Sequence, residues 1–156
     1  MHKQETVIMG KLGWLKALIL VSIILSVVQI VLGTEVREAI DAISKQMLYN
    51  GRSTWVSKVG DIFSYHRDLA MLVLILNIII YKIVKDKFSG KATALRVGSS
   101  IGIVLIIQIA TGLLLSNLAL PPYAQAMHIL FSTLLFSLQY YLYLLVYGTS
   151  TYNQRD

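Results

Sequence analysis

Four long apolar stretches constrain this chain more than any other feature. They cover about residues 12–33, 62–84, 95–116 and 122–147, and about 20 apolar residues are enough to cross the hydrocarbon layer of a bilayer. In lipid, every backbone N–H and C=O must be paired within the structure, so only helices and closed barrels can span it. Long apolar runs without alternation indicate helices. The sequence therefore predicts an all-α integral membrane protein, with residues 1–156 forming a single four-helix bundle.

Composition narrows the function classes. Hydrophobic residues make up 56% of the chain and charged residues only 14%, whereas soluble domains carry about 25% charged residues. The chain has no cysteine, which excludes disulfides and thiolate metal sites. Its net charge of +6 is not arranged as a basic patch interleaved with aromatic residues, so we expect no nucleic-acid partner. Without a nucleophile–base pair or a glycine-rich phosphate loop, hydrolysis and phosphoryl transfer are not expected.

The distribution of charge predicts the orientation in the membrane. With both termini on one side, that side carries nine basic and three acidic residues, namely Lys3, Lys11, Lys16, Lys82, Lys85, Lys87, Lys91, Arg96, Arg155, Glu5, Asp86 and Asp156. The other side carries five of each, namely Arg37, Lys45, Arg52, Lys58, Arg67, Glu35, Glu38, Asp41, Asp61 and Asp68. Basic residues favour the cytoplasmic side. We therefore expect cytoplasmic termini, in the cytoplasmic membrane of a bacterium or archaeon. Because residues 12–33 are too long for a secretory signal and lack its cleavage pattern, we expect them to be retained as a span.

The segment after the first span has its own pattern. EVREAIDAISKQML, residues 35–48, places apolar and charged residues on opposite faces of a helix, which predicts a short amphipathic helix lying on the outer interface. At the other link, only residues 117–122 join the third and fourth helices. These two helices must therefore be antiparallel neighbours. Pro122 suits the first turn of the fourth helix.

A repeat joins the two halves of the chain. Residues 29–33 read QIVLG and residues 108–112 read QIATG, so the first and third spans each carry a glutamine one turn before a glycine. The second and fourth spans each carry a histidine near the same end, His66 in SYHRDLA and His128 in AQAMHILF. The pattern indicates two copies of a helix pair, related by an axis along the membrane normal.

Two imidazoles at one depth on alternate helices could supply both axial ligands of a haem iron. His66 and His128 each lie five or six residues inside a helix, about 7–9 Å below the helix ends. A glycine at 33 and 112 would let a porphyrin approach the helix backbone, and Gln29 and Gln108 could hydrogen-bond a ligand histidine or a haem edge.

Other roles stay open on this pattern alone. Small residues in membrane helices also serve helix packing, and a glutamine or histidine there can bond a neighbouring helix or relay protons. Arg67, next to His66, and Arg37, beyond QIVLG, are candidate partners of a haem propionate. The alternative for each arginine is interfacial anchoring, or pairing with Asp68 or Glu38.

The order of these motifs resembles one half of haem A synthase, a cytochrome oxidase assembly family. The resemblance rests on VVQIVLGTEVREAID, SYHRDLA, LIIQIATGLLL and AQAMHILF, and it covers nearly the whole chain. That family has two four-helix halves, each with histidines on its second and fourth helix, and the second-helix histidine is typically followed by arginine. This chain is most similar to the C-terminal half, which implies that His66 and His128 bind one b-type haem.

The chain also departs from the family pattern. It has no second half, and it lacks the cysteine pair found in an outer loop of many members. The catalytic half of the family has a glutamate shortly before the second-helix histidine, whereas here Phe63 lies three residues before His66 and the nearest upstream carboxylate is Asp61. The features linked with oxidation of the haem methyl group are therefore missing, and no catalytic residue is predicted.

The expected function is that of a membrane b-type cytochrome with one bis-histidine haem near the outer face. Electron transfer by a lone haem needs a redox donor and acceptor, so we expect other membrane subunits or a homo-oligomer as partners. One alternative is a half-sized haem A synthase that acts as a dimer or with a partner half. The other is a haem-free structural membrane subunit, whose histidines bond across helices.

Overall fold

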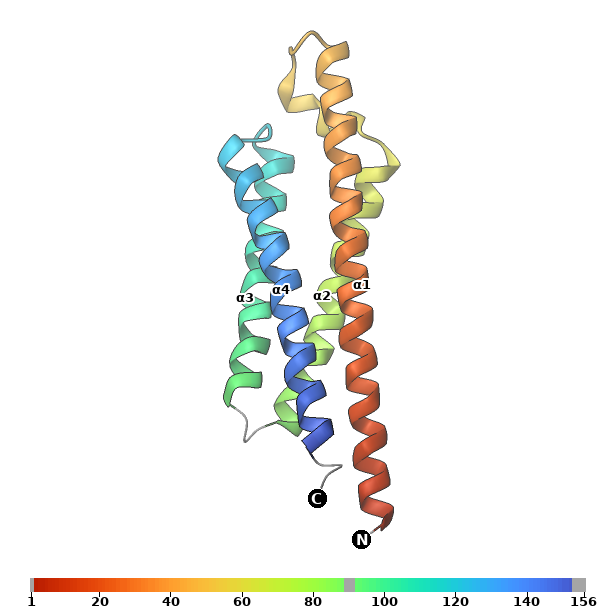
Figure 1. Cartoon of the computed structure of the whole chain (residues 1–156). Helices are drawn as coiled ribbons and strands as arrows, with labels where there is room; N and C mark the ends of the chain where they lie inside the picture. The colour runs from red at the N-terminus through yellow and green to blue at the C-terminus, as the bar shows by residue number, and fades with distance from the viewer. Residues whose placement is uncertain (1, 89–91, 153–156) are drawn as a thin grey trace.

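The computed structural model describes residues 2–88 and 92–152, and the side chains of residues 13–88 and 92–148. Within these residues the chain forms four long helices, joined by short links (Figure 1). They are α1 (His2–Gln46), α2 (Asp61–Lys87), α3 (Ala92–Asn117) and α4 (Pro122–Tyr152), with two 3-10 turns, η1 (Arg52–Thr54) and η2 (Val56–Lys58), between α1 and α2. The predicted all-α, four-helix class is confirmed.

Three helical segments among the described residues are long and apolar enough to cross a membrane: Gly13–Gln46, Ala92–Asn117 and Pro122–Gly148. α2 is the exception, although it has 27 residues. Charged residues approach its middle from both ends, and only residues 69–81 separate Asp68 from Lys82. The membrane crossing of α2 therefore stays a prediction.

The helices form a ring in chain order, with neighbours antiparallel. α1 packs against α2 and α4, and α3 packs against the same two helices, so α1 and α3 lie on one diagonal and α2 and α4 on the other. The start of α1 and the end of α4 lie at the same end of the bundle (Figure 1). The antiparallel packing of α3 and α4 and the start of α4 at Pro122 are as predicted. The cytoplasmic placement of this end stays a prediction, and part of its charge count, namely Lys3, Glu5, Lys11, Lys91, Arg155 and Asp156, lies outside the described side chains.

The segment predicted as a short amphipathic helix is not a separate element. α1 continues through Gly33 without a break to Gln46, and the Thr34 hydroxyl donates to the Val31 carbonyl at 2.6 Å, within the helix. The apolar face of this extension packs on protein: Ile40 is buried against Trp55, which follows η1, and Leu120, in the α3–α4 link. An amphipathic pattern fits both situations, because a face that suits an interface also suits a covering loop.

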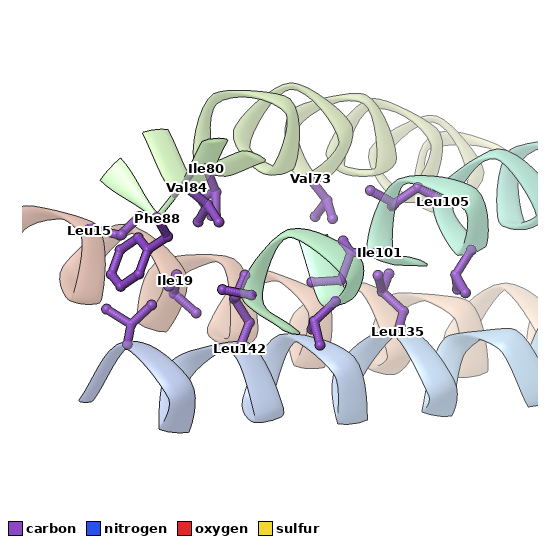
Figure 2. Close-up of a cluster of buried hydrophobic side chains, with 14 residues drawn as sticks. Leu15, Ile19, Val73, Ile80, Val84, Phe88, Ile101, Leu105, Leu135 and Leu142 are labelled. Carbon is purple, nitrogen blue, oxygen red and sulfur yellow. The ribbon is translucent and has the colours of Figure 1, made fainter. Parts of the chain in front are cut away.

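Two separate apolar cores hold the bundle together. The lower core, at the end of the chain termini in Figure 1, is built from 14 buried side chains of all four helices and their links, shown in Figure 2. The upper core consists of Ile40, Trp55 and Leu120. On every helix a stretch without either core's buried residues lies between them, and His66, His128, Gly33 and Gly112 fall in these stretches. We call this level the histidine layer.

A buried polar cluster ties three helices together below the histidine layer. Asn77 of α2 donates to the Ser22 hydroxyl of α1 at 2.8 Å, and Gln139 of α4 donates to the same hydroxyl at 3.0 Å and to the Asn77 carbonyl oxygen at 3.3 Å. Each of the three lies 11 residues, or three helical turns, from the histidine layer. The pairs on each helix are Ser22 and Gly33, Asn77 and His66, and Gln139 and His128. These bonds fix the vertical register of α1, α2 and α4.

We expect Asn77→Ala to lower the free energy of unfolding by about 1–2 kcal/mol, because hydrogen bonds between membrane helices contribute about 0.6 kcal/mol on average and up to about 1.7 kcal/mol. The measurement is equilibrium unfolding of the detergent-solubilised protein in sodium dodecyl sulfate. Ile78→Ala, at the neighbouring exposed position, is the matched control and should change the stability less. Equal losses in the two variants would show that the cluster does not hold the helices.

Candidate functional site

The two histidines of the repeat meet at the centre of the bundle. His66 comes from α2 and His128 from α4, the two helices on one diagonal, and both side chains are half-buried. Their ring centroids lie 6.4 Å apart, with the ring planes inclined by 62°. The sequence placed them at one depth by their distance from the helix starts, and the structure brings them together.

A glycine lies against each ring. A Cβ atom added to Gly33 of α1 would lie 3.3 Å from Cε1 of His66, and one added to Gly112 of α3 would lie 3.5 Å from Cε1 of His128. The first distance is tighter than ordinary van der Waals contact, and the second is ordinary contact. Each histidine therefore faces helix backbone of its own helix pair, and a residue with a side chain at Gly33 would displace the ring.

The two glutamines support the histidines in different ways. Gln29 Nε2 donates to the backbone carbonyl of His66 at 2.8 Å and lies 3.4 Å from the ring Nε2 atom. Gln108 does not contact the His128 side chain through its own amide. Its Nε2 atom donates to the Ser132 hydroxyl at 2.5 Å, and this hydroxyl donates to the His128 carbonyl at 2.7 Å. Both amides thus hold the helix turn that carries the histidine.

Two residues of the site were missed from the sequence. The Thr111 hydroxyl lies 2.9 Å from Nδ1 of His128, and Ser132 completes the link from Gln108. Hydroxyl residues are common in membrane helices, where they often bond their own backbone. The available signals were the position of Thr111 directly before Gly112 and the position of Ser132 one turn after His128.

Several polar atoms of the histidine layer are buried without a hydrogen bond. Within the described side chains, these include Oε1 of Gln29, Nδ1 of His66 and Oε1 of Gln108. Buried polar groups in proteins are nearly always paired, and each exception calls for an explanation such as a ligand. The other unpaired buried atoms among the described side chains are Ser26 Oγ and Gln139 Oε1, so three of the five lie around the histidine pair, which makes this layer the candidate binding site.

The donor set fits a haem better than a bare metal ion. Among the described residues, no group of three or more His, Cys, Asp or Glu side chains could hold a metal ion. Two imidazoles suffice only where the other ligands come with the metal, as they do in a porphyrin. An imidazole nitrogen binds a transition metal at about 2 Å, which puts the centres of two opposed rings about 6 Å apart. The separation of 6.4 Å between the two ring centroids agrees with this value.

The two candidate propionate partners lie near this layer. Arg67 follows His66, is exposed, and pairs with Asp68 at 3.2 Å, which is the pairing that the sequence left as an alternative. Arg37 lies one turn beyond Gly33 and pairs with Asp41 at 3.1 Å rather than with Glu38. It also donates to Gln125, one turn before His128 on α4, and so bridges α1 and α4 above the histidines. Exposed ion pairs contribute little, so both guanidinium groups can exchange partners.

Comparison with protein families gives one match. A family model described as cytochrome oxidase assembly protein matches residues 5–140 of the chain. The matched region contains QIVLG, QIATG and both histidines of the site. No curated protein and no solved structure matches the chain.

We expect Gly33→Leu to lower the thermal unfolding midpoint, because the new side chain overlaps the His66 ring and overpacking costs about 1–3 kcal/mol. Gly13→Leu is the control on the same helix, since a Cβ atom there meets nothing within 4 Å. This control should keep or raise the midpoint, because leucine favours a helix over glycine by up to about 1 kcal/mol. Equal midpoints in Gly33→Leu and Gly13→Leu would refute the close approach of the His66 ring to Gly33.

Proposed function

This chain belongs to the cytochrome oxidase assembly protein family that includes haem A synthase, and from that premise we propose that it is a membrane b-type cytochrome. It holds one haem b between His66 and His128 and passes single electrons. The observation that carries the proposal is the pair of imidazole rings, 6.4 Å apart, on opposed helices.

Each residue of the site has a task in this proposal. His66 and His128 are the axial ligands, and Gly33 and Gly112 keep side chains out of the space beside the rings. Gln29 and Gln108 hold the ligand-bearing turns and have free amide oxygens toward the layer. Arg37 and Arg67 neutralise the haem propionates. When bound, a haem with two imidazole ligands supplies one-electron transfer between Fe(III) and Fe(II).

The surroundings suit that chemistry. The lower core closes the bundle beneath the histidine layer, with Val84, Leu142 and Val146 fully buried. This apolar packing excludes water, and the dryness around an iron centre together with its axial ligands sets the reduction potential. The upper end would face the outside of a bacterial or archaeal cytoplasmic membrane. Donor and acceptor would be other membrane subunits, or a second copy of the chain within a larger respiratory or haem-modifying assembly.

The first test is an absorption spectrum of the detergent-purified protein, oxidised and then reduced with dithionite. We expect a sharp low-spin b-type spectrum for the wild type. His66→Ala and His128→Ala should each lose the haem or turn it high-spin, because one axial ligand is missing. His2→Ala, which removes the third histidine of the chain, should leave the spectrum unchanged. A colourless wild type, even after haem supplementation, would refute the proposal and leave a structural membrane subunit.

Family membership favours a second candidate, a half-sized haem A synthase that acts as a dimer or with a partner half. Against it stand the absence of cysteine and the presence of Phe63 three residues before His66. Without a carboxylate there, the chain lacks the group that the enzyme family places beside its reacting haem.

The two candidates differ in the haem that they contain after co-expression with the preceding enzyme of the pathway. We expect extraction and mass analysis to give haem B alone, because the site binds haem without oxidising it. Phe63→Glu introduces a carboxylate three residues before His66, and this variant should still bind haem B. Recovery of haem A from the wild-type protein would decide for the enzyme.

A further inference from the structure

The two halves of the repeat differ at one position that touches a histidine. QIVLG has Leu32 before its glycine, whereas QIATG has Thr111 there. Thr111 is buried, with 7% of its surface exposed, and its hydroxyl is 2.9 Å from Nδ1 of His128. A leucine side chain has no atom that could make the equivalent bond to His66.

The direction of the Thr111–His128 bond follows from the other partners of the hydroxyl. Thr111 Oγ1 lies 2.9 Å from the Ile107 carbonyl and 3.0 Å from the Gln108 carbonyl. A carbonyl oxygen only accepts, and a hydroxyl has one hydrogen to donate. We assign the single Thr111 hydrogen to these carbonyls of its own helix, so that a lone pair of Oγ1 faces the ring. Nδ1 of His128 then carries the proton and donates it, which leaves the lone pair on Nε2.

His66 has no such support. Its Nδ1 atom is buried without a hydrogen-bond partner, on the side of the ring that faces Gly33. The contact to the His66 ring from Gln29 Nε2 is long, at 3.4 Å, and it reaches Nε2, so no hydrogen bond holds the Nδ1 side of this ring.

We propose that Thr111 is a positioning residue that makes the two axial ligands unequal, with His128 firmly held and His66 exchangeable. The inference rests on the proposed haem site. A metal-bound histidine usually donates its other N–H to an acceptor, which fixes the ring and makes it a stronger ligand, and loss of that acceptor typically weakens metal binding about 10–100-fold. Here one ligand has this acceptor and the other lacks it. An external ligand such as cyanide would replace the His66 nitrogen on Fe(III), an exchange in which the iron keeps its oxidation state.

Thr111→Val tests the role of the hydroxyl, because valine has nearly the same shape and no acceptor. We expect the rate of haem transfer to apomyoglobin to rise about 10-fold or more. The midpoint potential should become more positive, because a weaker ligand stabilises Fe(III) less. Thr111→Ser keeps the hydroxyl and should restore both values toward the wild type. If Thr111 had only a structural role, the midpoint potential would not shift in Thr111→Val and then return to the wild-type value in Thr111→Ser.

Leu32→Thr is the matched variant in the other half of the repeat. It offers His66 the acceptor that His128 already has, so cyanide should bind the ferric protein about 10-fold more slowly than in the wild type. As a direct comparison of the two ligands, His66→Gly should retain a high-spin haem on His128, whereas His128→Gly should lose most of its haem.

The outcomes separate this inference from the function on which it rests. A wild type without a low-spin spectrum overturns the bis-histidine site itself. A low-spin wild type with an unchanged haem-transfer rate and potential in Thr111→Val overturns the role of Thr111. Better haem retention in His128→Gly than in His66→Gly overturns the order of the two ligands.

Discussion

The approach of a histidine ring to the backbone of a glycine, made once in each half of the bundle, is the contact on which the rest of the structure depends. Side chains normally keep the axes of packed helices 8–10 Å apart, and at Gly33 only the His66 ring fills that space. The same arrangement joins Gly112 and His128. Because the helices form a ring, the two rings are then directed across the bundle toward each other. The glycines thus leave space beside the helix backbone, and the histidine rings fill it.

Burying a polar layer inside an apolar bundle costs free energy unless its atoms find hydrogen-bond partners. The two cores hold the helices that carry this layer in place. The lower core and the cluster of Ser22, Asn77 and Gln139 fix the register of the helices beneath the layer. The upper core fixes it above, and the unbroken α1 is long enough to reach both. The turns that carry His66 and His128 are therefore held from both sides, as the proposed haem site would need. Such preorganisation of ligands by their supporting residues is what a precise metal site requires.

The sequence predicted the features that follow from length and spacing, and it missed those that depend on tertiary contacts. Helices of spanning length needed only apolar runs, and the common depth of His66 and His128 needed only their distance from the helix starts. The continuity of α1 was missed because an amphipathic face is the same whether lipid or the 47–60 loop covers it. Arg37 had acidic neighbours at positions 38 and 41, and only the fold, which also brings Gln125 close, selects Asp41. Thr111 was missed because its direction depends on the rotation of α3, which apolar residues on all sides of that helix leave undetermined.

In the proposed haem site, a duplicated helix pair would produce two equivalent ligands, so any difference between them must come from departures from the repeat. A symmetric pair of equally held imidazoles favours an electron carrier, because both bonds persist through the change of oxidation state. A pair with one weaker member can open a coordination position, which is the first requirement for chemistry on a bound molecule. Leu32 and Thr111, which stand at equivalent positions of the repeat, are such a departure, and Thr111 contacts its histidine. In the proposed haem site, single residues beside the histidines would therefore decide how firmly each histidine is held, while the histidines themselves stay the same.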